Sequence, residues 1–329
     1  MMRRLLLPLT PLYATAVAAK NAVYDRKVTK PQRLKWPVIS VGNISVGGSG
    51  KTPFVICLAE LLKRHGVLVD VLSRGYGRNS GAVERVDPAG DAERFGDEPL
   101  LIAQSADVPV YVGSSRYASG YLAEREQAVT GIHLLDDGFQ HRKLARSVDI
   151  VLMHRSDFQE TLLPSGQLRE PISSVKRASV VVLREEDGDL EQKLKQPGIE
   201  KTIWWIRRSI AVPDNAGKVV AFCGIARSDE FFQMLAQHHV QTVATRAFRD
   251  HHRYVEEDIR QLIQEAQTHS ANTFVTTEKD FVRLLPRQKE MIAFVAALQV
   301  AKLETRLCDE AAALRHLETL LPAVFKHSL

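Results

Sequence analysis

Short runs of apolar, largely β-branched residues alternate with helix-length segments in the first half of the chain. Their nearly continuous apolar character, in place of strict alternation, is typical of strands in a parallel sheet covered on both faces. Between the first two runs, residues 54–64 have helical character and end at His65-Gly66, with glycine where helices commonly end. The pattern predicts a βαβ beginning and an α/β fold. The five runs are 38–41, 67–72, 108–112, 132–135 and 148–152.

A second series of apolar runs follows, and turn residues separate it from the first. Leu163-Pro164-Ser165-Gly166 and Glu170-Pro171 supply turn chemistry, so we place a domain boundary near residues 155–175. We expect a first parallel-sheet domain over residues 1–160 and a second, smaller α/β domain over residues 161–304. A C-terminal helix within 305–329 can pack back on the first domain. The predicted strands are 179–183, 202–206, 219–222, 272–276 and 292–298, with a charged, helix-compatible stretch at 184–201.

The composition sets only wide limits on function. The 329 residues are 45% hydrophobic and 25% charged, which is ordinary for a globular protein of about two domains. Cys57, Cys223 and Cys308 lie far apart and suggest neither a disulfide framework nor a zinc site, so a reducing compartment is expected. The formal charge of +5 suits an anionic membrane surface, a phosphorylated substrate or nucleic acid, without choosing among them.

The N-terminal segment carries a membrane signal. Arg3 and Arg4 precede an uncharged run, residues 5–19, and further cations follow it as far as residue 35. Pro8 and Pro11 interrupt the run, and a nucleotide-binding motif follows soon after, which argues against a cleaved secretory signal. The run is also shorter than the ~20 residues of a spanning helix. We predict an interfacial anchor on the cytoplasmic face of a membrane, with a helix docked on the core as the alternative.

The strongest motif follows the first predicted strand. Glycines in such a turn let backbone N–H groups converge on phosphate oxygens, and the N-terminus of the following helix adds a favourable potential. Lys51 is expected to contact the β- and γ-phosphates, and Thr52 to bind Mg²⁺. Ser45 stands where the strict P-loop pattern has glycine, and Pro53 fits a first helical turn. The motif is Gly42-Asn43-Ile44-Ser45-Val46-Gly47-Gly48-Ser49-Gly50-Lys51-Thr52-Pro53.

Carboxylates near other predicted strands are candidates to complete this site. Asp136 and Asp137 end an apolar run, at the sheet edge where parallel sheets bind ligands. A carboxylate there can orient Mg²⁺ or its water shell, and a solvated turn is the alternative. Asp97, in the turn Gly96-Asp97-Glu98-Pro99, is either a base that orients a substrate hydroxyl or a loop cap.

Two polar motifs lie further along the chain. Asp250-His251-His252 is compatible with a metal site, a catalytic role or a surface loop, although no third ligand follows at typical zinc spacing. Residues 276–280, Thr-Thr-Glu-Lys-Asp, resemble a nucleotide-base reader but not the Asn-Lys-x-Asp of GTPases.

Together these motifs resemble one family, tetraacyldisaccharide 4′-kinase, the lipid A 4′-kinase of Gram-negative bacteria. They occur in family order between residues 38 and 280, and Ser45 agrees with the family's own pattern. The matching segments are 42–43, 47–53, 73–77, 96–99, 136–141, 163–171, 222–226, 250–251 and 276–280.

The resemblance implies ATP- and Mg²⁺-dependent phosphorylation of the 4′-hydroxyl of a tetraacyl disaccharide 1-phosphate. The enzyme would be held peripherally or monotopically on the cytoplasmic face of the inner membrane, with its site between a P-loop domain and a second α/β domain. No nucleic acid or obligate protein partner is expected. A membrane-associated P-loop regulatory ATPase is the alternative. The implied roles are catalysis for Asp97 as base, His251 as its partner and Lys51; cofactor binding for residues 47–53, Arg116 and Glu170; and metal binding for Thr52, Asp136 and Asp137.

Overall fold

The computed structural model describes residues 2–127, 129–196, 198–212 and 217–325. Parts of the expected N-terminal anchor and C-terminal helix lie outside this description. They are Met1, the side chains of Arg3 and Arg4, and residues 326–329. The strands are β1 (Val38–Asn43), β2 (Val69–Ser73), β3 (Glu84–Arg85), β4 (Val110–Val112), β5 (Ile132–Asp136), β6 (Val148–Leu152), β7 (Val180–Arg184), β8 (Thr202–Ala211), β9 (Val219–Cys223), β10 (Thr242–Ala247), β11 (Thr273–Thr277) and β12 (Ala297–Leu307).

These twelve strands form one sheet in the order β10-β9-β11-β12-β8-β7-β6-β1-β5-β2-β4-β3. All neighbouring pairs are parallel except β12 with β8 and β3 with β4. The predicted α/β class with a largely parallel sheet is confirmed. The helices are α1 (Thr10–Asp25), α2 (Lys51–Arg64), α3 (Ala92–Phe95), α4 (Asp97–Ala106), α5 (Arg116–Glu126), α6 (Leu190–Lys195), α7 (Ser228–Gln237), α8 (Glu256–His269), α9 (Glu278–Arg283), α10 (Pro286–Val295), α11 (Glu310–Leu320) and α12 (Pro322–Phe325), with 3₁₀ helices η1 (Met2–Leu9), η2 (Arg155–Phe158), η3 (Ile172–Arg177) and η4 (Glu185–Asp187).

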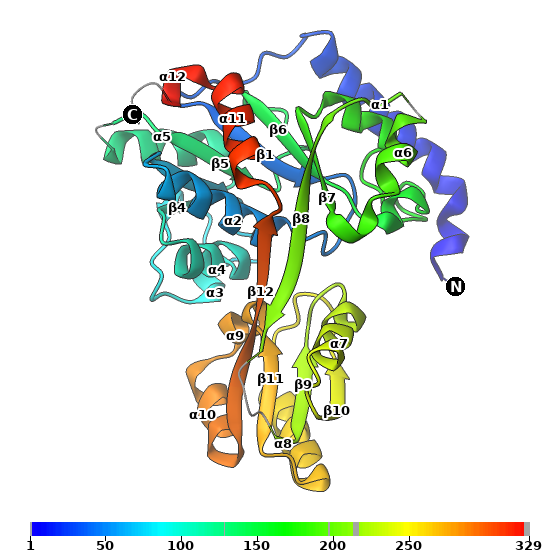
Figure 1. Ribbon diagram of the computed structural model, residues 1–329, viewed down its shortest axis with the longest axis vertical. Helices are drawn as coiled ribbons and strands as arrows, with labels where there is room; N and C mark the ends of the chain where they lie inside the picture. Colours follow the sequence, from blue (N-terminus) through cyan, green and yellow to red (C-terminus); the bar gives the residue numbers. More distant parts are fainter. Residues whose placement is uncertain (1, 128, 197, 213–216, 326–329) are drawn as a thin grey trace.

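Figure 1 shows a larger first lobe and a smaller second lobe, joined by the long strands β8 and β12. In the first lobe, alternate residues of each strand face opposite sides of the sheet. On β7, Val180 and Val182 join the core under α2, α4 and α11, whereas Val181 joins the cluster on the other face with α6. Both faces are therefore covered, which explains the continuous apolar runs in the sequence.

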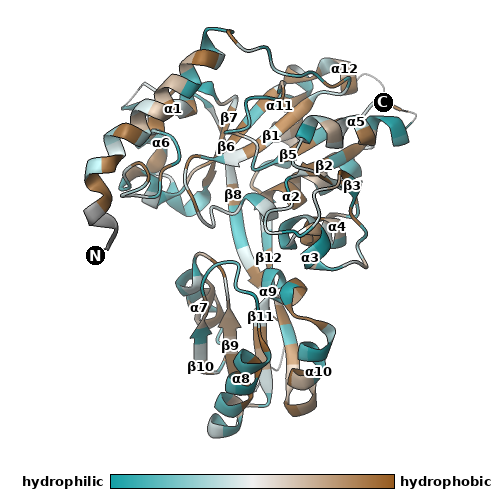
Figure 2. Ribbon diagram, turned by 180° about the vertical axis from the view of Figure 1, so that it is seen from behind, coloured by the Kyte–Doolittle hydropathy of each residue, from teal (hydrophilic) through white to brown (hydrophobic). Residues whose placement is uncertain are grey.

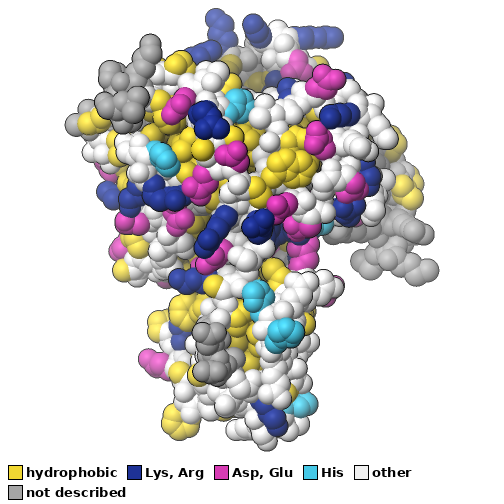
Figure 3. Space-filling model, in the orientation of Figure 1, with side chains coloured by type: hydrophobic (Ala, Val, Ile, Leu, Met, Phe, Trp, Pro, Cys, Tyr) yellow, Lys and Arg dark blue, Asp and Glu magenta, His cyan; other side chains and the backbone are white. Residues whose placement is uncertain are grey.

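The second lobe repeats this layering around β9 and β11. Phe222 and Phe274 pack against α8 and α10 on one face, whereas Ala221 and Val275 pack against α7 on the other. Figure 3 shows Lys, Arg, Asp and Glu side chains along the narrow region where the two lobes meet.

Three expectations about the second half of the chain need comment. A strand at 292–298 is wrong for residues 292–295, because α10 begins at Pro286 and continues to Val295. Ile292 is buried and Phe294 is 93% exposed, which reflects a helix lying on the lobe surface. The helix expected within 305–329 is α11, which begins after β12 ends at Leu307 and packs on the first-lobe core. Strands β6 and β7 pair across the expected boundary at residue 160, so the sheet is continuous there, and the division into domains stays a prediction.

Helix α1 lies along the outside of the first lobe and has no buried residue (Figures 1 and 2). Its contacts with the lobe are polar: Tyr13 Oη donates to the Arg169 carbonyl at 3.1 Å, and Asn21 Nδ2 donates to Glu170 Oε2 at 2.9 Å. Leu7 and Leu12 are 52% and 70% exposed. No helix in the described part of the chain is both long and apolar enough to cross a membrane.

Candidate active site

The glycine-rich loop, residues 42–53, connects β1 to α2. Gly47 has φ 101° and Gly50 has φ 85°, backbone conformations that favour glycine. Gly50 is also the N-cap of α2 and supplies no side-chain cap, so the N–H groups of the first turn have no partner within the helix. The loop therefore presents free donors and the positive end of the helix dipole to the space above it.

Parallel pairing brings the loop to the acidic end of β5. Val41 of β1 lies opposite Asp136 of β5. Lys51 Nζ lies 3.4 Å from Asp137 Oδ1 and donates to Asn43 Oδ1 at 3.2 Å. Asp137 also accepts two contacts from Arg169 Nη1, at 2.8 and 3.0 Å. Burial opposes ionisation of Asp137, but Lys51 and Arg169 outweigh it and lower the pKa of that carboxyl.

Asp136 has a different environment from its neighbour. It is 2% exposed, and its Oδ2 accepts a hydrogen bond from Ser73 Oγ at 3.2 Å. Its buried Oδ1 has no hydrogen-bond partner among the described residues. Burial, together with the negative charges of Glu98 and Asp137, raises the pKa of Asp136 to about 7. An unpaired buried carboxylate oxygen in an acidic environment is a natural ligand for a cation.

The two lobes contact each other through Asp97, the first residue of α4. Asp97 Oδ2 lies 2.9 Å from His251 Nδ1 and accepts from Arg283 Nε at 2.8 Å. Burial opposes ionisation, but the hydrogen bond from His251 and the charge of Arg283 together hold the pKa of Asp97 well below its usual range. In turn, the hydrogen bond to Asp97 raises the pKa of His251 despite partial burial. Asp97 is thus an ionised, oriented acceptor from Nδ1–H of His251.

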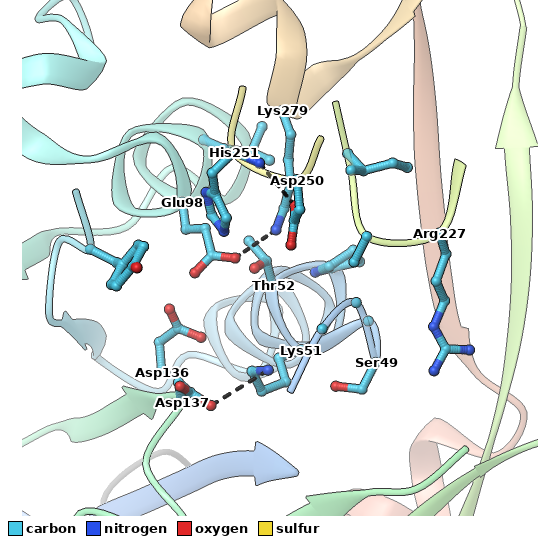
Figure 4. A pocket seen from close by; sticks show the side chains of 18 of the residues that line it. Ser49, Lys51, Thr52, Glu98, Asp136, Asp137, Arg227, Asp250, His251 and Lys279 are labelled. Atoms are coloured by element: carbon cyan, nitrogen blue, oxygen red, sulfur yellow. Dashed lines mark hydrogen bonds and ion pairs between the residues drawn. The ribbon is translucent and has the colours of Figure 1, made fainter. Parts of the chain in front are cut away.

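A second contact between the lobes lies beside the first. Lys279 Nζ, from α9, lies 2.6 Å from Glu98 Oε1, from α4. Figure 4 shows Glu98, His251 and Lys279 grouped above Thr52, with Asp136 and Asp137 on one side of Lys51 and Arg227 on the other. The two ion pairs hold α9 of the second lobe against α4 of the first.

A cavity of about 760 Å³ lies between these groups. All of residues 47–53 line it, and so do Arg116, Asp136, Asp137 and His251. Asp97 is not part of the lining and reaches the cavity through His251. Glu170 is also absent from the lining: it is 3% exposed and contacts Asn21 of α1 and Arg177 at 2.9 Å each. The structure therefore brings together the predicted site residues except Glu170, which supports α1.

The other polar motifs separate into distinct roles. His252 Nε2 lies 2.9 Å from Asp258 Oδ2 and its ring stacks on Phe248, so only His251 of the two histidines faces Asp97. Asp280 is fully buried and accepts from the Gly224 amide and Tyr254 Oη, both at 2.9 Å. Among the described residues, no group of three or more His, Cys, Asp or Glu side chains is arranged to hold a metal ion.

Sequence reasoning predicted Arg116, which lines the cavity, but it missed three other arginines of the site. Arg283 is 7% exposed and contacts Asp97, Asp280 and the Gly224 carbonyl. Arg169 contacts Asp137, and Arg208 of β8 lies against the glycine-rich loop. Arg169 lies in the family-like segment 163–171, and Arg283 follows Asp280 by three residues on one helix, whereas Arg208 had no local signal.

Comparison with known proteins gives a consistent result. The family model for tetraacyldisaccharide-1-P 4'-kinase, LpxK, matches residues 2–322. The tetraacyldisaccharide 4'-kinase of Koribacter versatilis is 43% identical over 318 residues, covering 93% of this chain and 96% of that protein. That of Chlorobaculum parvum is 35% identical over 317 residues, covering 88% and 87%.

A solved structure is similar along its whole length. The crystal structure of LpxK from Aquifex aeolicus, described as an "apo" form in complex with ATP, superposes with a TM-score of 0.76 at 31% sequence identity. The match covers 99% of this chain and 100% of that one.

Proposed function

The chain belongs to the tetraacyldisaccharide-1-P 4'-kinase family and is a tetraacyldisaccharide 4'-kinase of lipid A biosynthesis, and we propose that it transfers the γ-phosphate of ATP within the cavity between its lobes. The acceptor is the 4′-hydroxyl of the lipid disaccharide 1-phosphate. The observation that carries this proposal is the convergence of a phosphate-binding loop, an unpaired buried carboxylate and an Asp–His pair on one cavity.

The glycine-rich loop acts as a P-loop for ATP. Its free N–H groups and the N-terminus of α2 suit the phosphate chain. Lys51 is 12% exposed, and its contacts with Asn43 and Asp137 fix its ammonium group beside the loop, where it would bind the β- and γ-phosphates. Catalysis of phosphoryl transfer depends mostly on such positioning and on charge neutralisation.

The residues beside the loop fit Mg²⁺. The unpaired Oδ1 of Asp136 and the buried hydroxyl of Thr52 are oxygen ligands, and Mg²⁺ typically takes one or two carboxylates together with phosphates and water. Asp136 is the better carboxylate of the pair, because Asp137 already contacts Lys51 and Arg169. When bound near Asp136 and Thr52, Mg²⁺ would supply positive charge that neutralises the charge developing during phosphoryl transfer.

Asp97 and His251 act together on the acceptor hydroxyl. Because Nδ1–H of His251 donates to Asp97, Nε2 is the nitrogen of the neutral ring that can accept a proton. His251, unlike Asp97, lines the cavity. His251 would accept the hydroxyl proton, and the Asp97 carboxylate would stabilise the resulting imidazolium. Asp97 is therefore a base only through His251.

The N-terminal segment brings the site to the inner membrane. The exposed leucines of η1 and α1, followed by the cations that begin at Lys20, suit the interface of an anionic bilayer. The segment is also connected to the site, since Arg169 contacts both Tyr13 of α1 and Asp137. A lipid acceptor would thus reach the cavity from the side of Arg169, which lines it.

The direct test supplies γ-³²P-ATP, Mg²⁺ and a detergent-dispersed tetraacyl disaccharide 1-phosphate to the purified chain. We expect label in the lipid with the wild type and none with Lys51→Ala. Release of labelled phosphate without labelled lipid, from protein that binds ATP, would contradict transfer to the lipid within this cavity.

A further inference from the structure

Arg208 lies on β8, one of the two strands that join the lobes. Ile206 and Ile210, two residues to either side, face the same way, and they belong to the first-lobe and second-lobe cores respectively. Arg208 therefore occupies an inward position between two hydrophobic cores. Arg207, its neighbour in sequence, points to the opposite face, where it is 70% exposed and pairs with Glu185.

The Arg208 guanidinium has unsatisfied donors. Its side chain is 12% exposed, and Nε and Nη1 are buried without a hydrogen-bond partner among the described residues. The nearest carboxylate oxygen, Glu230 Oε2, is 3.7 Å from Nη1. Glu230 already bonds Arg184 and Arg227, at 2.9 and 2.8 Å. Burial and the charge of Arg184 lower the pKa of Arg208 to about 10. The charged guanidinium at this position therefore reduces the stability of the fold.

The guanidinium lies directly against the glycine-rich loop. A Cβ atom built on Gly50 would be 3.7 Å from Cζ of Arg208 and 3.8 Å from Nη1. Gly50 is the N-cap of α2, the point where the helix presents its free N–H groups. Arg227 approaches the same loop, with its Cγ 3.9 Å from a Cβ built on Gly48. Figure 4 shows Arg227 on the side of Ser49 that faces away from Asp136.

We propose that Arg208 is a nucleotide-binding residue, whose guanidinium binds the phosphate chain of ATP from the strand that joins the lobes. The proposal rests on the proposed function, because it takes the glycine-rich loop as the phosphate site. A guanidinium donates strong hydrogen bonds to phosphate oxygens, and such bonds would satisfy donors that the protein itself leaves unpaired. Lys51 and Arg208 would then hold the phosphate chain from two sides, with Arg208 contributed by the strand on which the lobes join.

Binding constants of single variants test this assignment. ATP and inorganic tripolyphosphate are titrated calorimetrically, without Mg²⁺, into wild type, Arg208→Gln, Arg208→Lys and the matched control Arg207→Gln. Arg208→Gln should weaken both ligands about 10- to 100-fold, the range for a lost charged hydrogen bond. Arg208→Lys keeps the positive charge but loses the planar guanidinium, and it should weaken the binding of both ligands less. Arg207→Gln should stay within about twofold of wild type.

Thermal melting of the ligand-free proteins separates binding from structural support. Because Arg208 is buried with unsatisfied donors and only a distant carboxylate, Arg208→Met should raise the melting temperature while weakening ATP binding. Unchanged ATP affinity with a lower melting temperature would overturn the proposal and leave Arg208 a structural residue. Weaker ATP binding with normal tripolyphosphate binding would also overturn it, since the effect would then concern the base. Failure of the wild type to bind ATP would contradict the proposed function instead.

Discussion

Asp97→Asn is the most informative single substitution, because it removes a charge and almost no volume. Asp97 orients His251 through the 2.9 Å contact and contacts Arg283 across the lobe interface. Asparagine keeps an oxygen that can accept from Nδ1–H, but it cannot stabilise an imidazolium as a carboxylate does. The substitution should therefore reduce the chemical step while leaving the glycine-rich loop and ATP binding intact.

The magnitude follows from these contacts. General base catalysis contributes about 10²- to 10⁴-fold, so kcat should fall by that factor, equivalent to roughly 3–5 kcal/mol. Removing one member of a buried ion pair costs about 3–5 kcal/mol when the other is left uncompensated. Arg283 keeps Asp280 Oδ1 at 3.1 Å and the Gly224 carbonyl at 2.6 Å. The loss in the free energy of unfolding should thus be smaller, about 1–3 kcal/mol.

The pH dependence provides a second measurement on the same variant. The hydrogen bond and charge of Asp97 raise the pKa of His251 above the ordinary value of 6.5, and the neutral imidazole is the base. In the wild type, kcat should rise with pH and level off above an apparent pKa higher than 6.5. In Asp97→Asn this acid limb should move to lower pH, because the group that favours the protonated imidazole is gone.

The matched control is Asp258→Asn. Asp258 makes the same kind of contact, 2.9 Å to His252, but neither residue lines the cavity. Steady-state labelling of the lipid should give a kcat within about twofold of wild type for this variant. A kcat for Asp97→Asn within tenfold of wild type, or an equal loss in Asp258→Asn, would refute the assignment of the Asp97–His251 pair.

Four further predictions concern the loop, the metal, the fold and the membrane. Lys51→Met should reduce kcat/KM for ATP at least 100-fold, measured by the same labelling assay, because the phosphates lose an oriented cation. Asp136→Asn should raise the Mg²⁺ concentration for half-maximal rate at least tenfold in a metal titration, and Asp137→Asn should raise it less. Gly42→Ala should destabilise the fold by about 1–3 kcal/mol in urea unfolding, because its Cβ would lie 2.6 Å from Phe139 Cβ. Leu12→Glu should lower the fraction that floats with anionic vesicles, whereas an unchanged fraction would place the membrane contact elsewhere.

The sequence by itself determined the parts of the site that depend on local order along the chain. The apolar runs at residues 38–41 and 132–135 predicted buried strands of a parallel sheet, and their polar ends lie together because parallel strands end at one edge of a sheet. Gly47 and Gly50, in the turn before Lys51, have positive φ values that favour glycine, which is likewise a local property of the sequence. Helix 54–64 and the α/β class follow from periodicity, which is a local property.

Only the tertiary structure decided which distant charges meet. Asp97 and Arg283 are 186 residues apart, and nothing in either motif selects that pairing. His251 differs from His252 only because the lobe contact turns one toward Asp97 and the other toward Asp258. Arg207 and Arg208 are adjacent residues of the same type, and the sequence does not distinguish them. In the structure, Arg207 is exposed to solvent, whereas Arg208 lies against Gly50. The difference arises because successive side chains of a strand point to opposite faces. Charge pairing across a lobe interface depends on packing, which local patterns do not encode.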